Sequence, residues 1–166
     1  MGRADLYWLD RRRRRPGPSA KEEKMARLTR IQHEGIPVKD LERSRAFYEG
    51  VLGLRTLPRP AFGPGVWLAD ASGVPQIHLI VSQAAVPGGD VRPDPTARHT
   101  AFLVEDYEEL KQRFEQHGVR FTEATNSPAR VAQLTAVDPD GHVLEFQPAE
   151  HYGDSIYTPG FEPQED

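Results

Sequence analysis

The sequence predicts an α+β fold built from two βαβββ modules in tandem. Apolar residues follow strand and helix spacing in the order strand, helix and three strands, and this whole order then occurs a second time. A chain of 166 residues is also long enough for two small modules that share a core, but too short for two large independent domains.

The first module is expected to span residues 28–82. It begins with a strand-like run at Thr29–Val38 and continues with a helix at Asp40–Leu52, for which Asp40 is a good N-cap and Gly53 a good C-terminal stop. Three strands should follow, separated by Pro, Gly, Asp and Ser residues. These strands are expected at Leu54–Leu57, Gly65–Ala69 and Pro75–Ser82.

The second module is expected to span residues 98–148, after a linker at 83–97 that is rich in Pro, Gly and Asp. A strand at Arg98–Val104 should lead into a helix at Asp106–His117, which Gly118 ends. The last of its three remaining strands follows a run whose chemistry suits a tight turn, Asp138-Pro139-Asp140-Gly141. These strands are expected at Val119–Thr122, Arg130–Val137 and His142–Gln147.

The two ends of the chain are expected to lie outside the modules. Residues 1–27 contain a run of arginines, Arg11–Arg15, beside prolines and glycine, a polar context that buries too little apolar surface to fold. We therefore expect a disordered N-terminal tail there, and a loose C-terminal arm at residues 149–166.

The composition restricts the chemistry. The chain has no cysteine, which excludes disulfides, thiolate metal sites and cysteine nucleophiles. Its formal net charge of -4 argues against a nucleic-acid partner. No run approaches the roughly 18 consecutive apolar residues of a membrane span, and none resembles a signal peptide. We therefore expect a cytoplasmic protein that binds neither nucleic acid nor membrane.

Four polar residues occupy corresponding places in the two modules. The expected helix N-caps lie seven residues after both His33 and His99, and His78 follows the first histidine by 45 residues as Glu145 follows the second by 46. A lone strand histidine is more often a hydrogen-bonded residue than a ligand, and a lone glutamate is more often an ion-pair partner. The paired recurrence instead favours a shared role.

Strand alternation places these residues on one side of their sheets. His33 should share a face with Gly35, and His99 with Ala101, while the apolar residues between them point toward the helices. Small neighbours leave room in a concavity, where imidazole and carboxylate groups could hold a first-row divalent ion. The remaining histidines are not expected to be ligands: His117, His142 and His151.

Two stretches of sequence resemble a known superfamily. Residues 33–44, followed by Phe47-Tyr48 and Val51–Leu54, resemble the opening of the glyoxalase/bleomycin-resistance/dioxygenase (vicinal oxygen chelate, VOC) superfamily. Asp138–Gly141 followed by Leu144–Phe146 resembles its closing signature. The resemblance covers residues 28–148 and implies an open, barrel-like cleft around one divalent metal ion per chain: Ni, Co, Zn, Mn or Fe. The implied ligands are His33, His78, His99 and Glu145.

The ligand count bears on the reaction that the resemblance implies. A fourth ligand at His78 leaves two positions on an octahedral ion, enough for two neighbouring oxygens of one small substrate but not for a bidentate catecholate plus O2. This favours a glyoxalase-like lyase or isomerase that stabilises an enediolate, with Glu145 as the catalytic base. Two alternatives stay open: an extradiol-type iron(II) dioxygenase, and a non-catalytic protein that binds a small molecule such as a drug.

The sequence also departs from glyoxalase I. His78 stands where a glutamate is typical, and Gly50 stands where that enzyme tends to carry a basic residue, so a glutathione hemithioacetal is disfavoured as substrate. Other residues that could line the cleft are more often packing or surface residues: Arg59, Trp67, Arg98 and Arg130. The site could close within one chain or across a homodimer, and the sequence leaves both open.

Overall fold

The computed structural model describes residue 28 and residues 31–60, 63–82, 87–88, 90–125 and 131–150. The chain divides into residues 1–30, of which only Leu28 is described, and one folded unit, Ile31–Asp166. Most of the expected N-terminal tail, and the C-terminal arm from residue 151, therefore lie outside the described residues. Within the described part of the chain, no helix is long and apolar enough to cross a membrane.

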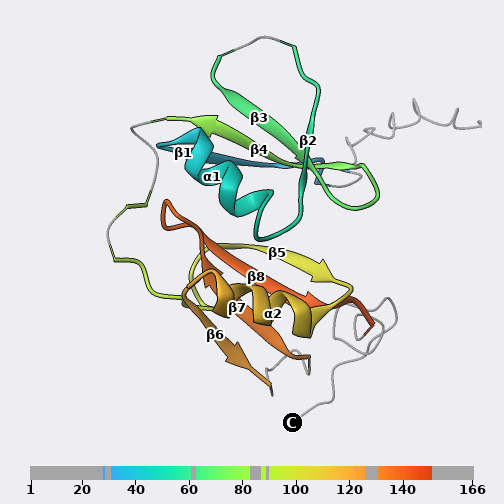
Figure 1. Cartoon of the computed structure of the whole chain (residues 1–166), viewed down its shortest axis with the longest axis vertical. Helices are drawn as coiled ribbons and strands as arrows, with labels where there is room; N and C mark the ends of the chain where they lie inside the picture. Colours follow the sequence, from blue (N-terminus) through green and yellow to red (C-terminus); the bar gives the residue numbers. More distant parts are fainter. Residues whose placement is uncertain are drawn as a thin grey trace, which may run out of the picture. The chain divides into compact units, whose positions relative to one another are not determined.

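The predicted βαβββ order occurs twice in the folded unit (Figure 1). The elements of the first module are β1 (Glu34–Val38), α1 (Leu41–Tyr48), β2 (Arg55–Leu57), β3 (Gly65–Ala69) and β4 (Pro75–Val81). Those of the second module are β5 (His99–Val104), α2 (Tyr107–Gln116), β6 (Phe121–Ala124), β7 (Gln133–Val137) and β8 (Val143–Pro148).

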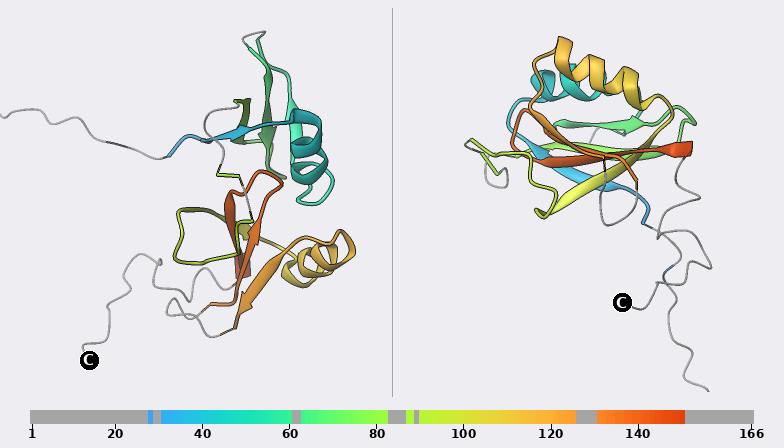
Figure 2. Two further views of the ribbon diagram at one scale, coloured as in Figure 1. Left: turned by 90° about the vertical axis from the view of Figure 1, so that its left-hand side faces the viewer. Right: turned by 90° about the horizontal axis from the view of Figure 1, so that it is seen from below.

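Each module forms one four-stranded mixed sheet with the same topology. The strand orders are β1-β4-β3-β2 and β5-β8-β7-β6, and in each sheet the first pair is parallel and the others are antiparallel. Each helix lies against one face of its own sheet (Figure 2). The α+β class and the tandem modules are confirmed, and among the described strands the two sheets are not closed into a barrel.

The helix ends follow the predicted capping residues. The side chain of Asp40 accepts the backbone N–H of Arg43 at 3.0 Å, and Gly53 adopts a positive φ of 76°. Helix α1 nevertheless ends at Tyr48 rather than at the expected Leu52, because the following residues form a turn whose amides bond back to the last helical carbonyls. Strand β1 also begins later than expected, at Glu34, where its parallel pairing with β4 starts.

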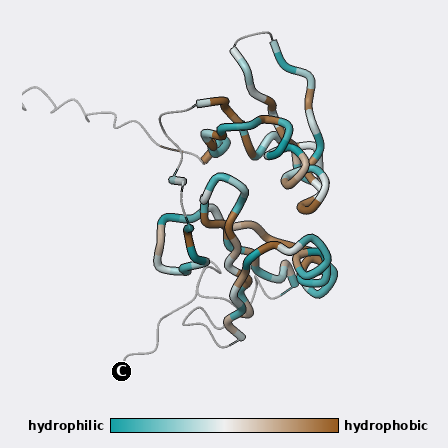
Figure 3. Tube along the Cα trace, turned by 60° about the vertical axis from the view of Figure 1, so that its left-hand side comes forward, coloured by the Kyte–Doolittle hydropathy of each residue, from teal (hydrophilic) through white to brown (hydrophobic). Residues whose placement is uncertain are grey.

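Apolar side chains from both modules form the core. Ile36 and Val38 on β1 are buried, whereas Gly35 before them is exposed and Pro37 between them is only partly buried, as the predicted alternation requires. Figure 3 shows hydrophobic stretches along the strands and a largely hydrophilic α2. The buried core cluster comprises Ile36, Val38, Phe47, Tyr48, Val51, Val66, Leu68, Ile77, Leu79, Tyr107, Leu110, Phe114, Leu134, Ala136, Leu144 and Phe146.

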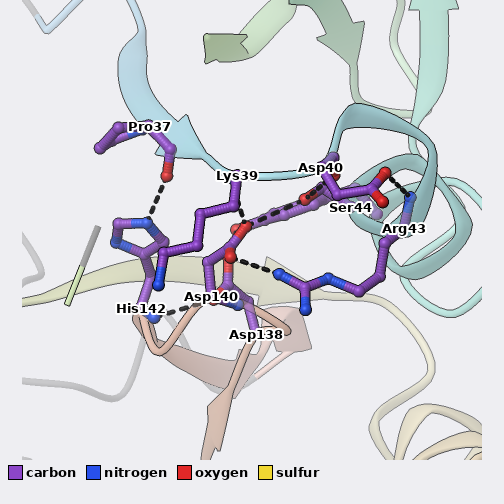
Figure 4. Close-up of polar contacts among 9 residues, drawn as sticks. Pro37, Lys39, Asp40, Arg43, Ser44, Asp138, Asp140 and His142 are labelled. Carbon is purple, nitrogen blue, oxygen red and sulfur yellow. Dashed lines mark hydrogen bonds and ion pairs between the residues drawn. The ribbon is translucent and has the colours of Figure 1, made fainter. Parts of the chain in front are cut away.

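A buried carboxylate connects the turn before β8 to the start of α1 (Figure 4). Asp140, whose side chain is 1% exposed, accepts the backbone N–H of Lys39 at 3.1 Å and pairs with the guanidinium of Arg43. The hydroxyl of the buried Ser44 lies 3.3 Å from the same carboxylate. The second module therefore contributes an acceptor to the helix start of the first.

The other aspartate of this turn makes a second connection. Asp138 accepts the phenolic O–H of the fully buried Tyr48 at 2.8 Å. Burial, and then the charge of Asp138, raise the pKa of the Tyr48 hydroxyl well above its usual value. His142 Nε2 lies 2.7 Å from the carbonyl oxygen of Pro37, so this nitrogen donates. The predicted tight turn is present, and it also holds the two modules together.

Candidate functional site

The first module places two candidate ligands around one tryptophan. His33 lies just before β1, and His78 on β4 pairs in register with Trp67 on β3. The Trp67 and His78 rings are stacked, with centroids 4.4 Å apart and an interplanar angle of 10°. His33 meets the same indole edge-on at 4.5 Å, and the two histidine rings are 6.3 Å apart. Trp67 therefore contacts both candidate ligands, which the sequence did not indicate.

His78 also has a cationic neighbour. Nη1 of Arg59, in the loop between β2 and β3, lies 3.3 Å from His78 Nε2. A guanidinium can only donate, so Nε2 accepts in this arrangement and the ring proton is on Nδ1. Burial, the charge of Arg59 and the charge of His33 lower the pKa of His78. The imidazole is therefore held in its neutral form.

The second module brings its two candidate ligands face to face. His99 opens β5 and Glu145 lies in the middle of β8, and His99 Nε2 is 3.8 Å from Glu145 Oε2. Glu145 is only 5% exposed, and its other carboxylate oxygen accepts the amide of Gln147 at 2.7 Å. The carboxylate is thus oriented by one neighbour and open to the histidine through its second oxygen.

In both His33 and His99 the ring proton lies on Nδ1, so Nε2 is the nitrogen that can bind a metal ion. His99 Nδ1 lies 2.8 Å from the carbonyl oxygen of Ala97, and His33 Nδ1 contacts the side-chain oxygen of Gln32. Because both oxygens are acceptors, Nδ1 carries the proton in each ring and Nε2 keeps its lone pair. This arrangement is typical of metal-ligating histidines. The 3.8 Å between His99 Nε2 and Glu145 Oε2 is close to the span of two ligand atoms bound at about 2.0–2.2 Å from one ion.

The four candidate ligands form two pairs, one in each module. His33 and His99 both line one cavity of about 400 Å³, to which neither His78 nor Glu145 contributes. Among the described residues, no group of three or more histidine, aspartate or glutamate side chains converges on a point that could hold an ion. The single four-ligand centre therefore stays a prediction, and the donor chemistry of each pair fits it.

The other polar candidates have different surroundings. His117 is exposed at the end of α2, and His142 donates to Pro37 as described above. Arg98 is exposed and pairs with Glu34 at 3.4 Å. His151 and Arg130 lie outside the described residues. Sequence analysis missed Gln147, which orients the Glu145 carboxylate; its position two residues along the same strand face was the available signal.

Comparison with known proteins identifies the family. The model of the Glyoxalase/Bleomycin resistance protein/Dioxygenase superfamily matches residues 30–146. A glutathione transferase, FosA, from Serratia marcescens is 34% identical over 121 residues, which cover 72% of this chain and 80% of that protein. Glyoxylase I 4 from Arabidopsis thaliana is 28% identical over 128 residues, covering 72% and 70%.

A crystal structure of a glyoxalase family protein from Bacillus anthracis has the same fold. It superposes with a TM-score of 0.59 at 24% identity, covering 75% of this chain and 98% of that chain. The repeated topology and the family match agree with one another. The chain therefore belongs to the glyoxalase/bleomycin resistance protein/dioxygenase superfamily.

Proposed function

We propose that this protein is a divalent-metal-dependent lyase or isomerase that acts on a small substrate with two neighbouring oxygens. The observation that carries the proposal is the pair in the second module: His99 Nε2 faces the buried carboxylate of Glu145 at 3.8 Å. A deprotonated ring nitrogen and a carboxylate oxygen together are a donor set for nickel, cobalt, zinc, manganese or iron.

The proposed ligand set takes both pairs: His33, His78, His99 and Glu145. His33 and His99 already present Nε2 as an acceptor. Ligation by His78 requires that Nε2 exchange its contact with Arg59 for the ion. Since the pairs belong to different modules, the set could be completed within one chain or between two copies of it, and the mass of the metal-loaded protein in solution separates these cases.

A bound divalent ion would act as a Lewis acid toward the two substrate oxygens and make the neighbouring carbon-bound hydrogen more acidic. Glu145 is the proposed base. The carbon–hydrogen bond breaks, the proton goes to a Glu145 oxygen and the electron pair enters the enediolate of the substrate. Gln147 holds Oε1, so the oxygen available is Oε2, which would have to leave the ion to accept the proton, in surroundings that exclude most water.

Metal titration followed by solvent exchange tests the proposal. Calorimetric titration of the metal-free protein with Ni²⁺ should give one ion per chain, and the loaded protein should exchange the C–H hydrogens of an α-hydroxyketone with deuterium. The His99→Ala variant should lose both properties, whereas His117→Ala, which removes an exposed histidine of the same module, should lose neither. Equal losses in both variants, or the absence of metal binding, would refute the proposal.

A second candidate is the addition of a thiol to an electrophilic carbon. It is favoured by the 34% identity to a protein named as a glutathione transferase. The thiol then appears in the product, and no deuterium enters an α-hydroxyketone, so the exchange experiment separates the two reactions. Oxygen uptake with catechols on iron(II)-loaded protein tests the extradiol dioxygenase alternative, and ligand binding without turnover would identify a binding protein.

A further inference from the structure

A second cavity adjoins the one that His33 and His99 line. Its volume is about 340 Å³, and it shares Glu34, His99 and Thr100 with the first cavity. The two cavities are therefore neighbours, and they adjoin at the starts of β1 and β5. Because His99 is a proposed ligand, a substrate that binds an ion beside this histidine has the second cavity within reach.

The second cavity is built by described parts of both modules. Its walls are the edge of β1, the start of β5, the turn before β8 and the linker. The backbone N–H of Gly88 donates to the carbonyl oxygen of Asp140 at 3.1 Å, which holds the linker on that turn. Val91 packs so closely on Gly141 that an added Cβ would lie 3.0 Å from a methyl carbon of the valine. Walls that are already packed cost little to order when a ligand binds.

The lining of this cavity is mostly apolar. Its apolar members come from β1, the linker and the start of β8: Ile36, Pro37, Pro87, Val91, Ala97 and Val143. Its two charged members, Glu34 and Arg98, pair with each other at 3.4 Å, so each offsets the charge of the other. The ring of His142 donates through Nε2 to the carbonyl oxygen of Pro37. A neutral apolar group therefore matches the cavity better than an ion does.

We propose that the second cavity receives an apolar group of the substrate, while two neighbouring oxygens of the same molecule bind the ion beside His99. The substrate class is then an α-hydroxycarbonyl compound with an uncharged alkyl or aryl substituent. The inference rests on the proposed function for the position of the oxygens, and it adds how the rest of the molecule is recognised. Val91 should limit the size of the substituent, because it lines the cavity from a linker position that belongs to no strand or helix.

Three probes with the same hydroxyketone group test this assignment. Hydroxyacetone carries only a methyl group, 1-hydroxyhexan-2-one adds three methylenes, and 6-hydroxy-5-oxohexanoate replaces the terminal methyl group of that chain with a carboxylate. Affinities are measured by NMR titration of the full chain, with and without Zn²⁺, which is diamagnetic and leaves the amide signals sharp. Shifts of the Val91 and Thr100 amide signals locate the apolar end of the probe.

The wild-type protein should bind 1-hydroxyhexan-2-one at least about tenfold more tightly than hydroxyacetone, since each buried methylene raises affinity a few-fold. The carboxylate probe should lose most of this gain, because its charge would lose water in an apolar cavity. Val91→Phe, which fills the cavity, should reduce the gain to about threefold or less. The matched control is Val74→Phe, which should keep the full gain, because Val74 is exposed in the turn between β3 and β4 and lines neither cavity.

Four results would overturn the inference: no gain in the wild-type protein, a full gain in Val91→Phe, an equal loss in Val74→Phe, or a carboxylate probe that binds as tightly as 1-hydroxyhexan-2-one. If Val91→Phe does not fold, as judged by circular dichroism, Val91→Met decides, and a full gain in that variant counts against the cavity. The proposed function fails separately, through the lack of metal binding or of hydrogen exchange. A gain in the metal-free protein, with shifts at Val91 and Thr100, would then still support the cavity.

Discussion

The two modules share one topology but surround their candidate ligands differently. In the first module His78 is partly exposed and lies between an indole and a guanidinium. In the second module Glu145 occupies the equivalent central strand, all of whose residues are buried, and its polar neighbours are Gln147 and His99. The two modules thus offer equivalent positions with different surroundings, and we propose that the acid–base group, Glu145, belongs to the second module.

The largest expected effect comes from the acid–base group. Glu145→Gln removes the proposed base but keeps an oxygen acceptor and nearly the same volume. The rate of C–H exchange should fall by about a hundredfold to ten-thousandfold, the contribution usual for a positioned base. Deuterium exchange followed by NMR measures the loss, and a thermal melt checks the fold. A rate within about threefold of the wild type would mean that the base lies elsewhere, and would break the proposed division of roles between the modules.

The next largest effect is expected from Asp140, whose contacts connect the two modules, and it concerns the stability of the fold. Asp140→Ala leaves the Lys39 amide and the Arg43 guanidinium without their buried acceptor. The free energy of unfolding should fall by about 1–3 kcal/mol, the usual cost of leaving a backbone amide without its buried acceptor, because the half-exposed Arg43 guanidinium can turn toward solvent. Urea unfolding should also become less cooperative. In a Trp8→Phe background, which leaves Trp67 as the one tryptophan, Trp67 emission reports the first module and should no longer coincide with circular dichroism.

The matched control for this variant is Asp94→Ala. Asp94 also accepts a backbone amide and a hydroxyl, both from Thr96, but it does so in an exposed turn of the linker. Its replacement should cost less stability and leave the two unfolding transitions coincident. An equal effect from both aspartates would show that the turn before β8 does not hold the modules together.

The contrast between local and long-range contacts explains what the sequence could predict. Alternation and capping residues located every described strand and helix to within about five residues, because these signals depend on neighbours in the chain. Strand parity likewise gave the alternation of burial along β1 and β5. The contacts of Asp140 and of Arg59 were missed. Both residues lie in loops, and their partners are fixed by how the modules and strands pack, which a single sequence does not reveal.

An intermediate effect, on metal affinity, is expected when His78 is replaced. If it joins the ion in exchange for its contact with Arg59, His78→Ala should weaken Ni²⁺ binding at least about tenfold, since even the loss of a residue that merely orients a ligand weakens metal sites by this amount. Calorimetric titration measures the affinity. Unchanged affinity would leave a three-ligand set of His33, His99 and Glu145, which suits iron(II) and O2 chemistry and would favour the dioxygenase alternative.

The smallest effect on stability at neutral pH is expected from Tyr48, the residue of the first module that donates to Asp138 of the second. Tyr48→Phe removes the donor to one oxygen of Asp138, but the other oxygen keeps two backbone N–H bonds, from Asp140 and His142. The expected cost in the free energy of unfolding at pH 7 is therefore only about 1–2 kcal/mol.

Alkaline pH should remove the stabilising contribution of the Tyr48 hydroxyl, a loss that the Tyr48→Phe variant cannot show. Burial and Asp138 raise the pKa of Tyr48 in the folded protein, so its hydroxyl stays protonated while the unfolded chain ionises it near its usual value of about 10. Its stabilising effect is thus complete below about pH 10 and is lost as the pH rises toward the folded pKa, by about 1.4 kcal/mol per pH unit. Urea unfolding at pH 7, 10 and 11 should show a shallower alkaline decline in Tyr48→Phe than in the wild type. Tyr107 has a raised pKa as well, and so Tyr107→Phe measures the second phenol separately. If Tyr48→Phe keeps the full wild-type slope, the decline comes from another group, and the contact between Tyr48 and Asp138 does not hold the phenol in its protonated form.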